Sequence, residues 1–385
     1  MAVRNMLNNN NVKQRNIFHS CYIILLLSFV IRLFSGAIFG TENIYVFLLL
    51  PSLLMVFSFF IYVINKKVTY VVFILFVFMS IFVLMQPEIF RATLLMLFFT
   101  MFVSRECDLK FVINVMVLVS IFSVFVIFVL VSTGIVENEV FETPRGYVYA
   151  LGFDNPNTAP LFMSTIFVLA TYAIKLSNKK EMLLPFIIFA SFLVYFLFIA
   201  TGTRTMVAVW FLFCLTILFK KIFINKITIR VIKLLPIIAL VSFYFMAMNY
   251  NSAVEILDSL LSFRIRYFRN FLIEFSIIDK IFGNAQITPT TPGRNAPANS
   301  FNVIFLSNGI IIFLMFFHFY RKSIDYYFYN KDYFSISVLL FFVLYGVTEA
   351  LLIGIAFFPN ILFWILLSRA ELVPKIAEIR KKRPM

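Results

Sequence analysis

The sequence predicts an all-α integral membrane protein with about twelve transmembrane helices. Of its 385 residues, 62% are hydrophobic and only 13% are charged, whereas soluble domains are about 45–50% apolar and about 25% charged. Apolar stretches recur along the whole chain, and most approach the roughly 20 residues that a helix needs to cross a hydrocarbon core of about 30 Å. Together these observations exclude a soluble globular fold.

The predicted spans follow one another with short connections. They run near 17–39, 44–64, 68–85, 89–104, 109–136, 157–176, 182–200, 206–219, 234–250, 299–318, 335–350 and 354–371. The first stretch is too long for the apolar core of a signal peptide and lacks a small-residue cleavage site before the next span. We therefore expect it to be retained in a single membrane domain over residues 1–385.

The distribution of basic residues predicts the orientation. With the N-terminus inside, Lys66–Lys67, Lys179–Lys180, Lys220–Lys221 and the basic C-terminal tail all fall on the inner side, as the positive-inside rule requires. The alternate connections are acidic or neutral. We expect both termini in the cytoplasm, and the net charge of +15 then follows from topology and does not indicate a nucleic-acid partner.

Nine of the 33 cations fall on the outer side or in the outer half of a span, and eight of these nine are Arg. They are Arg32, Arg91, Arg145, Arg204, Arg264, Arg266, Arg269, Lys280 and Arg294. Lys satisfies a topology rule as well as Arg does, but Arg is preferred for planar, bidentate contact with phosphate or carboxylate. The outer face is therefore predicted to hold an anion, and anchoring to lipid phosphates is the alternative for any single Arg.

Two extracytoplasmic loops are long enough to carry a site, 137–156 and 251–298. The first contains Arg145, and at its end Asp154 and Asn157 flank the mouth of the sixth span. Asn and Asp beside Pro are ordinary turn formers. The functional alternative is a polar rim that hydrogen-bonds sugar hydroxyls.

The second loop opens with a predicted amphipathic helix over Ala253–Phe275. At 100° per residue, Arg266 and Arg269 fall on its polar face, which suits a helix at the membrane surface. Arg264 falls in the middle of the apolar face, where an Arg is expected to be paired or to face a polar cavity. Snorkelling is the alternative, and we favour an Arg264 that meets a ligand phosphate in a cavity.

The rest of the second loop leads into the tenth span. The tract Thr288–Pro297, which contains Arg294, is rich in Pro and Thr and is predicted to be irregular. Asn299 and Ser300 then open the span, where a polar pair can simply cap the helix.

Two further positions lie at the predicted outer ends of spans. Arg204 belongs to the five-residue turn 201–205 between the seventh and eighth spans, so it is expected at the outer interface. Glu349 lies near the outer end of the eleventh span. A carboxylate at membrane depth is a functional candidate, and a structural ion pair with one of the Arg residues is an alternative of at least equal weight.

Several chemistries lack the residues that they need. Both histidines, His19 and His318, map to cytoplasmic ends of spans, and the three cysteines are placed where no disulfide is expected. No phosphate-binding glycine loop and no zinc-binding pattern occurs. We therefore predict no metal and no soluble cofactor.

The order of motifs resembles the O-antigen polymerase and ligase superfamily, the Wzy-like proteins, over roughly residues 137 to 371. The matching segments are NPN at 155–157, TGTR at 201–204, the RxR…R helix at 264–269, IFGNA at 281–285, NSF at 299–301, SNGIIIF at 307–313, Glu349 and the basic tail. Ligase members that resemble this pattern tend to carry a His directly before the Asn at the mouth of the tenth span, where this chain has Ala298. The resemblance therefore favours a polymerase over a ligase.

The resemblance implies polymerisation of undecaprenyl-diphosphate-linked oligosaccharide repeat units into O-antigen or capsular polysaccharide, at the outer face of a bacterial cytoplasmic membrane. The expected partners are that substrate and membrane lipids, with a chain-length regulator and a flippase as candidates. Ligase-type transfer and a flippase or transporter are the alternatives; a transporter is expected to keep ionisable residues near the midplane, often within internal repeats.

The implied roles divide the candidate residues into two sets. The catalytic candidates are Arg204, Arg264 and Arg266, which contact the diphosphate, and Glu349, which together with Asp154 is a candidate acceptor of the hydroxyl proton. The substrate-binding candidates are Arg145, Asp154, Asn157, Arg269, Arg294 and Asn299.

Overall fold

The structure is a computed structural model, and the residues that it describes lie mostly from residue 106 onward. The described residues are 16–27, 30, 34, 97, 100, 103–104, 106–143, 146–153, 155–220, 225–261, 263–284, 299–353 and 358–369. Over these residues the chain is helical apart from one hairpin and its connections, and five helices are long and apolar enough to cross a membrane. The predicted spans 44–64 and 68–85 lie outside the described residues, as does most of 89–104.

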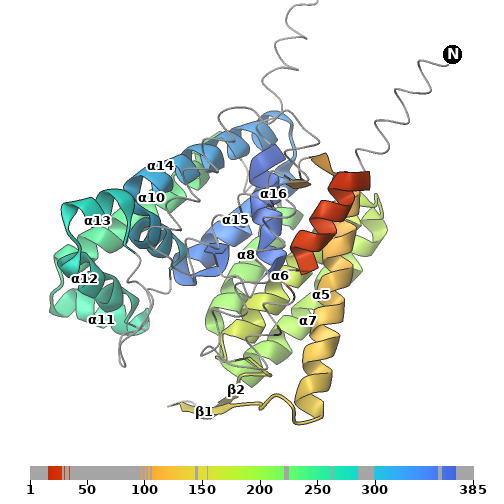
Figure 1. Cartoon of the computed structure of the whole chain (residues 1–385), viewed down its shortest axis with the longest axis horizontal. Coiled ribbons are helices and arrows are strands. Elements are labelled where there is room, and N and C mark those ends of the chain that lie inside the picture. The colour runs from red at the N-terminus through yellow and green to blue at the C-terminus, as the bar shows by residue number, and fades with distance from the viewer. Residues whose placement is uncertain are drawn as a thin grey trace, which may run out of the picture. The chain divides into compact units, whose positions relative to one another are not determined.

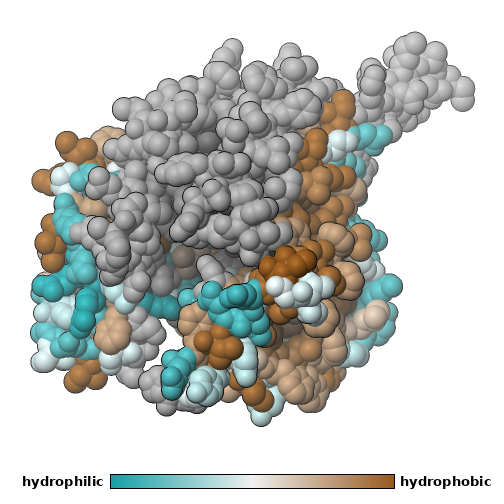
Figure 2. All heavy atoms as spheres, turned by 60° about the horizontal axis from the view of Figure 1, so that its bottom comes forward, coloured by the Kyte–Doolittle hydropathy of each residue, from teal (hydrophilic) through white to brown (hydrophobic). Residues whose placement is uncertain are grey.

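The described residues form two compact units, which we describe separately. In the first, α5 (Leu109–Ser132) packs on α6 (Thr158–Leu176), and α6 packs on α7 (Leu183–Thr201). Most of the apolar surface of α5 and α7 is exposed, whereas α6 is largely buried. Figure 2 shows hydrophobic residues over its right side, where α5 lies in Figure 1. Exposed faces of this kind suit contact with lipid tails.

The first unit also contains shorter elements. They are a helix over Asn16–Leu27, η1 (Lys180–Met182), the first part of α8 (Arg204–Leu218), η3 (Phe358–Asn360) and the start of α16 (Ile361–Arg369). A hairpin of β1 (Val140–Thr143) and β2 (Gly146–Tyr149) lies between α5 and α6 in the sequence. The strands are antiparallel, with Val140 opposite Tyr149. The sequence analysis did not predict this hairpin.

In the second unit, α14 (Ser300–Tyr329) is the central helix. It packs against α10 (Lys226–Met248), α13 (Ile277–Phe282) and α15 (Tyr333–Thr348), and most of its apolar window is buried. The short helices α11 (Ser252–Leu260), α12 (Arg264–Glu274) and α13 lie together near one end of α10 and α14 (Figure 1). The one-turn helix η2 (Leu351–Ile353) follows α15.

Polar residues placed directly before the helices explain where many of them begin. The side-chain oxygens of Asp108, Asn225, Asn251, Asn299 and Asp332 accept backbone N–H groups in the first turns of α5, α10, α11, α14 and α15. Ser276 and Asp279 form a reciprocal capping box at α13. Such caps satisfy donors that a helix leaves unpaired at its start.

Three helices have bounds that differ from those of the predicted spans. The ninth span was predicted from 234, but α10 begins at Lys226 because Asn225 caps it there. The tenth was predicted to end at 318, but α14 continues to Tyr329. Of the twelfth, predicted over 354–371, the described residues form η3 and α16 (Ile361–Arg369), and 354–357 and 370–371 lie outside the described residues. In the first two cases, hydropathy marks the apolar segment of a helix and misses its polar ends.

The predicted helix over Ala253–Phe275 is interrupted. Phe263 adopts a left-handed conformation with φ 61°, and the chain turns there between α11 and α12. The phase of the second half was nevertheless predicted correctly, because Ile265, Phe268 and Phe271 are buried on one side of α12. The interruption means that α11 and α12 are not one helix lying on the membrane surface.

The helix α14 is kinked at Gly309, where φ is 77° and ψ is 174°. The segment that follows α13 packs against this kink: the Asn284 N–H donates to the Leu306 carbonyl at 2.8 Å. Gly283 has a nearly identical conformation, with φ 79° and ψ 166°. A Cβ on Gly283 would overlap the Ser307 carbonyl, and a Cβ on Gly309 would overlap that of Ile281.

Candidate functional site

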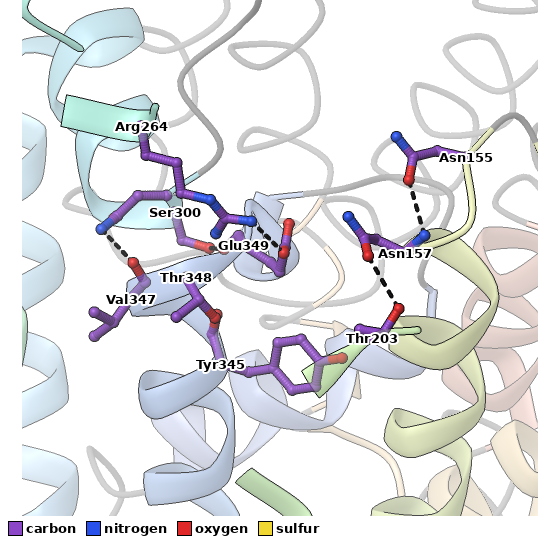
Figure 3. A network of polar contacts seen from close by, with 10 residues as sticks. Asn155, Asn157, Thr203, Arg264, Ser300, Tyr345, Val347, Thr348 and Glu349 are labelled. Carbon is purple, nitrogen blue, oxygen red and sulfur yellow. Dashed lines mark hydrogen bonds and ion pairs between the residues drawn. The ribbon is translucent and has the colours of Figure 1, made fainter. Parts of the chain in front are cut away.

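The first candidate group, in the second unit, is centred on an ion pair between Arg264 and Glu349. Arg264 is the first residue of α12, and Glu349 directly follows α15. Arg264 Nη2 lies 2.5 Å from Glu349 Oε1, and the two side chains are only 12% and 14% exposed (Figure 3). The expectation that Arg264 must be paired or face a cavity is therefore met by a carboxylate from a distant part of the chain.

The Glu349 backbone is held by the start of α14. Its carbonyl accepts the Ser300 N–H at 3.1 Å and the Ser300 hydroxyl at 2.7 Å. The Ser300 oxygen also accepts the Leu352 N–H at 3.0 Å. The sequence indicated that Ser300 could cap α14, but its side chain does not do so. Ser300 instead ties α14 to the end of α15 and fixes the residue that pairs with Arg264.

The helix cap is instead supplied by Asn299. Its Oδ1 accepts the N–H groups of Phe301 and Asn302, at 2.8 and 3.3 Å, and its Nδ2 donates to the Val347 carbonyl at 2.6 Å. The residue is fully buried. These contacts give Asn299 a structural task, and its predicted role in orienting sugar or phosphate remains a prediction.

Arg264 is positioned from the other side by Asp258. This buried carboxylate accepts the N–H groups of Ile265 at 2.7 Å and Arg266 at 3.0 Å, and the Tyr250 hydroxyl at 3.0 Å. It therefore supplies the acceptor that Phe263, at the cap position, does not provide. The carboxylate also suits the positive N-terminal end of a helix, so Asp258 sets where α12 starts.

One donor of Arg264 is unused. Nη1 is buried and has no hydrogen-bond partner among the described residues. A guanidinium whose one nitrogen donates to a carboxylate can still donate from its other nitrogens, in the same plane, to a second anion. The group therefore has the chemistry to bind an anionic oxygen beside the Arg264–Glu349 pair.

Arg266 and Arg269 have other surroundings. Arg266 forms a 2.9 Å ion pair with Glu255, and both side chains are substantially exposed; the Tyr250 hydroxyl, through a hydrogen bond, raises the pKa of Arg266. The Arg269 guanidinium lies over the Tyr250 ring at 5.3 Å. Two residues turn a helix by about 200°, so Arg266 points away from the side that carries Arg264.

The second candidate group lies in the first unit, at the start of α6 and the turn between α7 and α8. The Thr203 hydroxyl donates to Asn157 Oδ1 at 3.0 Å (Figure 3). The Thr201 hydroxyl donates to Thr203 at 3.2 Å. Asn155 Oδ1 accepts the Asn157 N–H at 2.8 Å. Arg204 begins α8 and is exposed. The predicted Asn157 is thus tied to the TGTR turn that carries Arg204.

Three predicted site residues, Arg145, Asp154 and Arg294, lie outside the described residues. Among those that are described, no group of three or more His, Cys, Asp or Glu side chains is placed to hold a metal ion.

Sequence reasoning missed Thr203, Asp258 and Asn302. Thr203 and Asp258 act through partners that are distant in sequence or beyond a turn, which periodicity does not reveal. Asn302 carried one signal, because an amide in the first turn of an apolar span is unusual. It is 1% exposed, and neither of its amide atoms has a partner among the described residues.

Searches against family models, curated proteins and solved structures gave no match to this chain.

Proposed function

We propose that this protein polymerises lipid-linked oligosaccharide repeat units at the outer face of a bacterial cytoplasmic membrane. The substrate is a glycan carried on undecaprenyl diphosphate, and the product is O-antigen or capsular polysaccharide. The proposal is supported by the motif resemblance, by the Arg-rich composition of the predicted outer face and by helices that suit a membrane.

The observation that carries the proposal is the state of Arg264. Its guanidinium is mostly buried and forms the ion pair with Glu349 through Nη2, whereas Nη1 has no partner among the described residues. A cation kept in a largely desolvated place is expected to serve a binding or catalytic purpose. Donors fixed in advance, where water is excluded, stabilise charge that develops in a reaction.

The reaction assigned to this site is a glycosyl transfer. A hydroxyl of the incoming repeat unit forms a bond to the anomeric carbon of the growing glycan, and the bond from that carbon to the diphosphate breaks. The diphosphate leaves with the electron pair, and Arg264 stabilises the charge. The hydroxyl proton passes to Glu349 or to Asp154, and no cofactor takes part.

Arg204 and the Asn157–Thr203 group are assigned to substrate binding within the first unit. Arg204 is exposed at the start of α8 and is free to meet a phosphate. Asn157 keeps its side-chain NH2 for a sugar hydroxyl, because its oxygen is the atom that Thr203 binds. Arg145, Asp154, Arg266, Arg269 and Arg294 remain further candidates.

The test is glycan chain length in cells that lack the gene and are complemented with wild type, Arg264→Ala or Arg230→Ala. Arg230 is an exposed cation near the start of α10 and serves as the matched control. We expect long chains with wild type and Arg230→Ala, and single repeat units with Arg264→Ala. Accumulation of repeat units on the cytoplasmic face in the deletion strain would instead establish a flippase, and loss of transfer to a final acceptor with long chains retained would establish a ligase.

A further inference from the structure

Asn302 is a buried polar side chain at the start of α14, and its amide has no partner among the described residues. It lies in the first turn of α14, is 1% exposed, and neither Nδ2 nor Oδ1 is hydrogen-bonded within the described part of the chain. Its backbone N–H is satisfied by the Asn299 cap. Since an unpaired buried amide destabilises a protein, Asn302 calls for an explanation.

The neighbouring polar residues have structural explanations, and Asn302 does not share them. Asn299 caps α14 and donates to Val347, Ser300 joins α14 to α15, and the Ser307 hydroxyl donates to the Val303 carbonyl at 2.6 Å. Each of these side chains stabilises the fold. The Asn302 amide contributes no such hydrogen bond.

The position of Asn302 relative to Arg264 follows from one aromatic contact. Phe268 of α12 packs against Phe305 of α14, with ring centroids 6.4 Å apart. Asn302 precedes Phe305 by three residues and Arg264 precedes Phe268 by four, so each lies one turn from the contact on the same side of its own helix. The first residues of both helices, Arg264 of α12 and Ser300 of α14, contact Glu349, so the two helices start close to the same residue.

We propose that Asn302 binds the sugar of the lipid-linked substrate next to the diphosphate that Arg264 contacts, an inference that rests on the proposed function. An amide offers two donors and an acceptor, which match a hydroxyl or acetamido group. The unused Arg264 Nη1 offers a donor for a phosphate oxygen. The two side chains therefore recognise adjoining parts of a glycosyl diphosphate.

The test uses purified full-length protein in detergent micelles with wild type, Asn302→Val, Asn302→Ala and Arg264→Gln. The two probes are bare undecaprenyl diphosphate and the undecaprenyl-diphosphate-linked repeat unit isolated from cells lacking this gene. We expect wild type to bind the glycosylated lipid more tightly than the bare one. Both Asn302 variants should lose about tenfold in affinity for the glycosylated lipid and none for the bare lipid. Arg264→Gln should weaken both.

Thermal unfolding of the same proteins distinguishes a binding role from a structural one. Because the amide has no partner among the described residues, the melting temperatures of both Asn302 variants should equal or exceed that of wild type. A fall of several degrees in both variants, or unchanged affinity for the glycosylated lipid, would overturn the inference and leave the proposed function standing. If wild type binds the glycosylated lipid no better than the bare one, the proposed function and this inference fail together.

Discussion

Arg264 and Glu349 are 85 residues apart in the sequence and form an ion pair of 2.5 Å between the first residue of α12 and the residue that follows α15. The pair therefore joins the start of α12 to the end of α15. Because both side chains are largely desolvated, neither charge is well compensated without the other. Substitutions of Arg264 and Glu349 can therefore be compared for their separate effects on stability and on activity.

Removing one charge of this pair should destabilise the protein more than removing both. Glu349→Gln leaves the Arg264 cation without its carboxylate, which should lower the free energy of unfolding by about 3 kcal/mol. The double variant Arg264→Gln with Glu349→Gln should recover part of this loss. A double-mutant cycle measured by denaturant titration in micelles checks it, and additive effects would show that the pair is not coupled.

The activity of Glu349→Gln separates the two roles assigned to that residue. If Glu349 accepts the hydroxyl proton, the variant should lose at least about 100-fold in polymerisation rate, the usual scale for a general base. It should also bind undecaprenyl diphosphate at least as tightly as wild type, because a negative charge beside Arg264 has been removed. A variant with normal rate would transfer the base role to Asp154.

The hydrogen bond between Thr203 and Asn157 is the simplest contact to test in the first unit. Thr203→Val keeps the shape of the side chain and removes the donor at 3.0 Å from Asn157 Oδ1. We expect a loss of about 1 kcal/mol in the free energy of unfolding. Ser132→Ala, which alters an exposed hydroxyl on α5, is the control and should be nearly neutral.

The sequence predicted features that depend on local periodicity and missed those that depend on distant partners. The 100° repeat placed Arg264 on the same side as Phe268 and Phe271, and the structure confirms that side as buried. It also indicated that such an Arg needs a partner. The sequence offered an ion pair with one of the Arg residues as an alternative for Glu349, and the structure shows such a pair. Which Arg would pair with Glu349 could not be predicted, because that depends on how Ser300 holds the end of α15.

The break between α11 and α12 shows a second limit of pattern reasoning. A continuous amphipathic pattern runs through Phe263, so nothing local signals a left-handed residue there. The turn is compensated by the Asp258 carboxylate, which accepts the first N–H groups of α12. The cap comes from Asp258, several positions before α12, and it stabilises the break relative to a continuous helix. Hydropathy does not detect such a cap.

Asp258 should therefore be a positioning residue for Arg264. Asp258→Asn replaces one acceptor oxygen by an NH2 group that faces an N–H or the Tyr250 hydroxyl, which should cost about 1–3 kcal/mol in unfolding free energy. Under the proposed function, polymerisation should also fall, because the start of α12 is no longer fixed. Glu255→Gln is the matched control, since Glu255 forms an exposed ion pair with Arg266 and its loss should change stability by less than about 1 kcal/mol.

The interlocked glycines of the second unit give the sharpest prediction about the fold. Gly283 and Gly309 share a backbone conformation that is essentially restricted to glycine, and a Cβ on either would overlap backbone of the other's segment. Gly283→Ala and Gly309→Ala should each lower the free energy of unfolding by at least about 2–3 kcal/mol.

The control for these glycines is Gly134, which has φ 72° but no atom within 4 Å of a built Cβ. Gly134→Asn should cost little, because Asn tolerates the left-handed region. Thermal unfolding of the three variants in micelles checks the difference. If Gly283→Ala and Gly309→Ala have the same melting temperature as the control, the segment after α13 does not pack against the kink of α14. If they melt at a lower temperature than the control, the contact between Asn284 and Leu306 holds the short helices α11, α12 and α13, and with them Arg264, against α14.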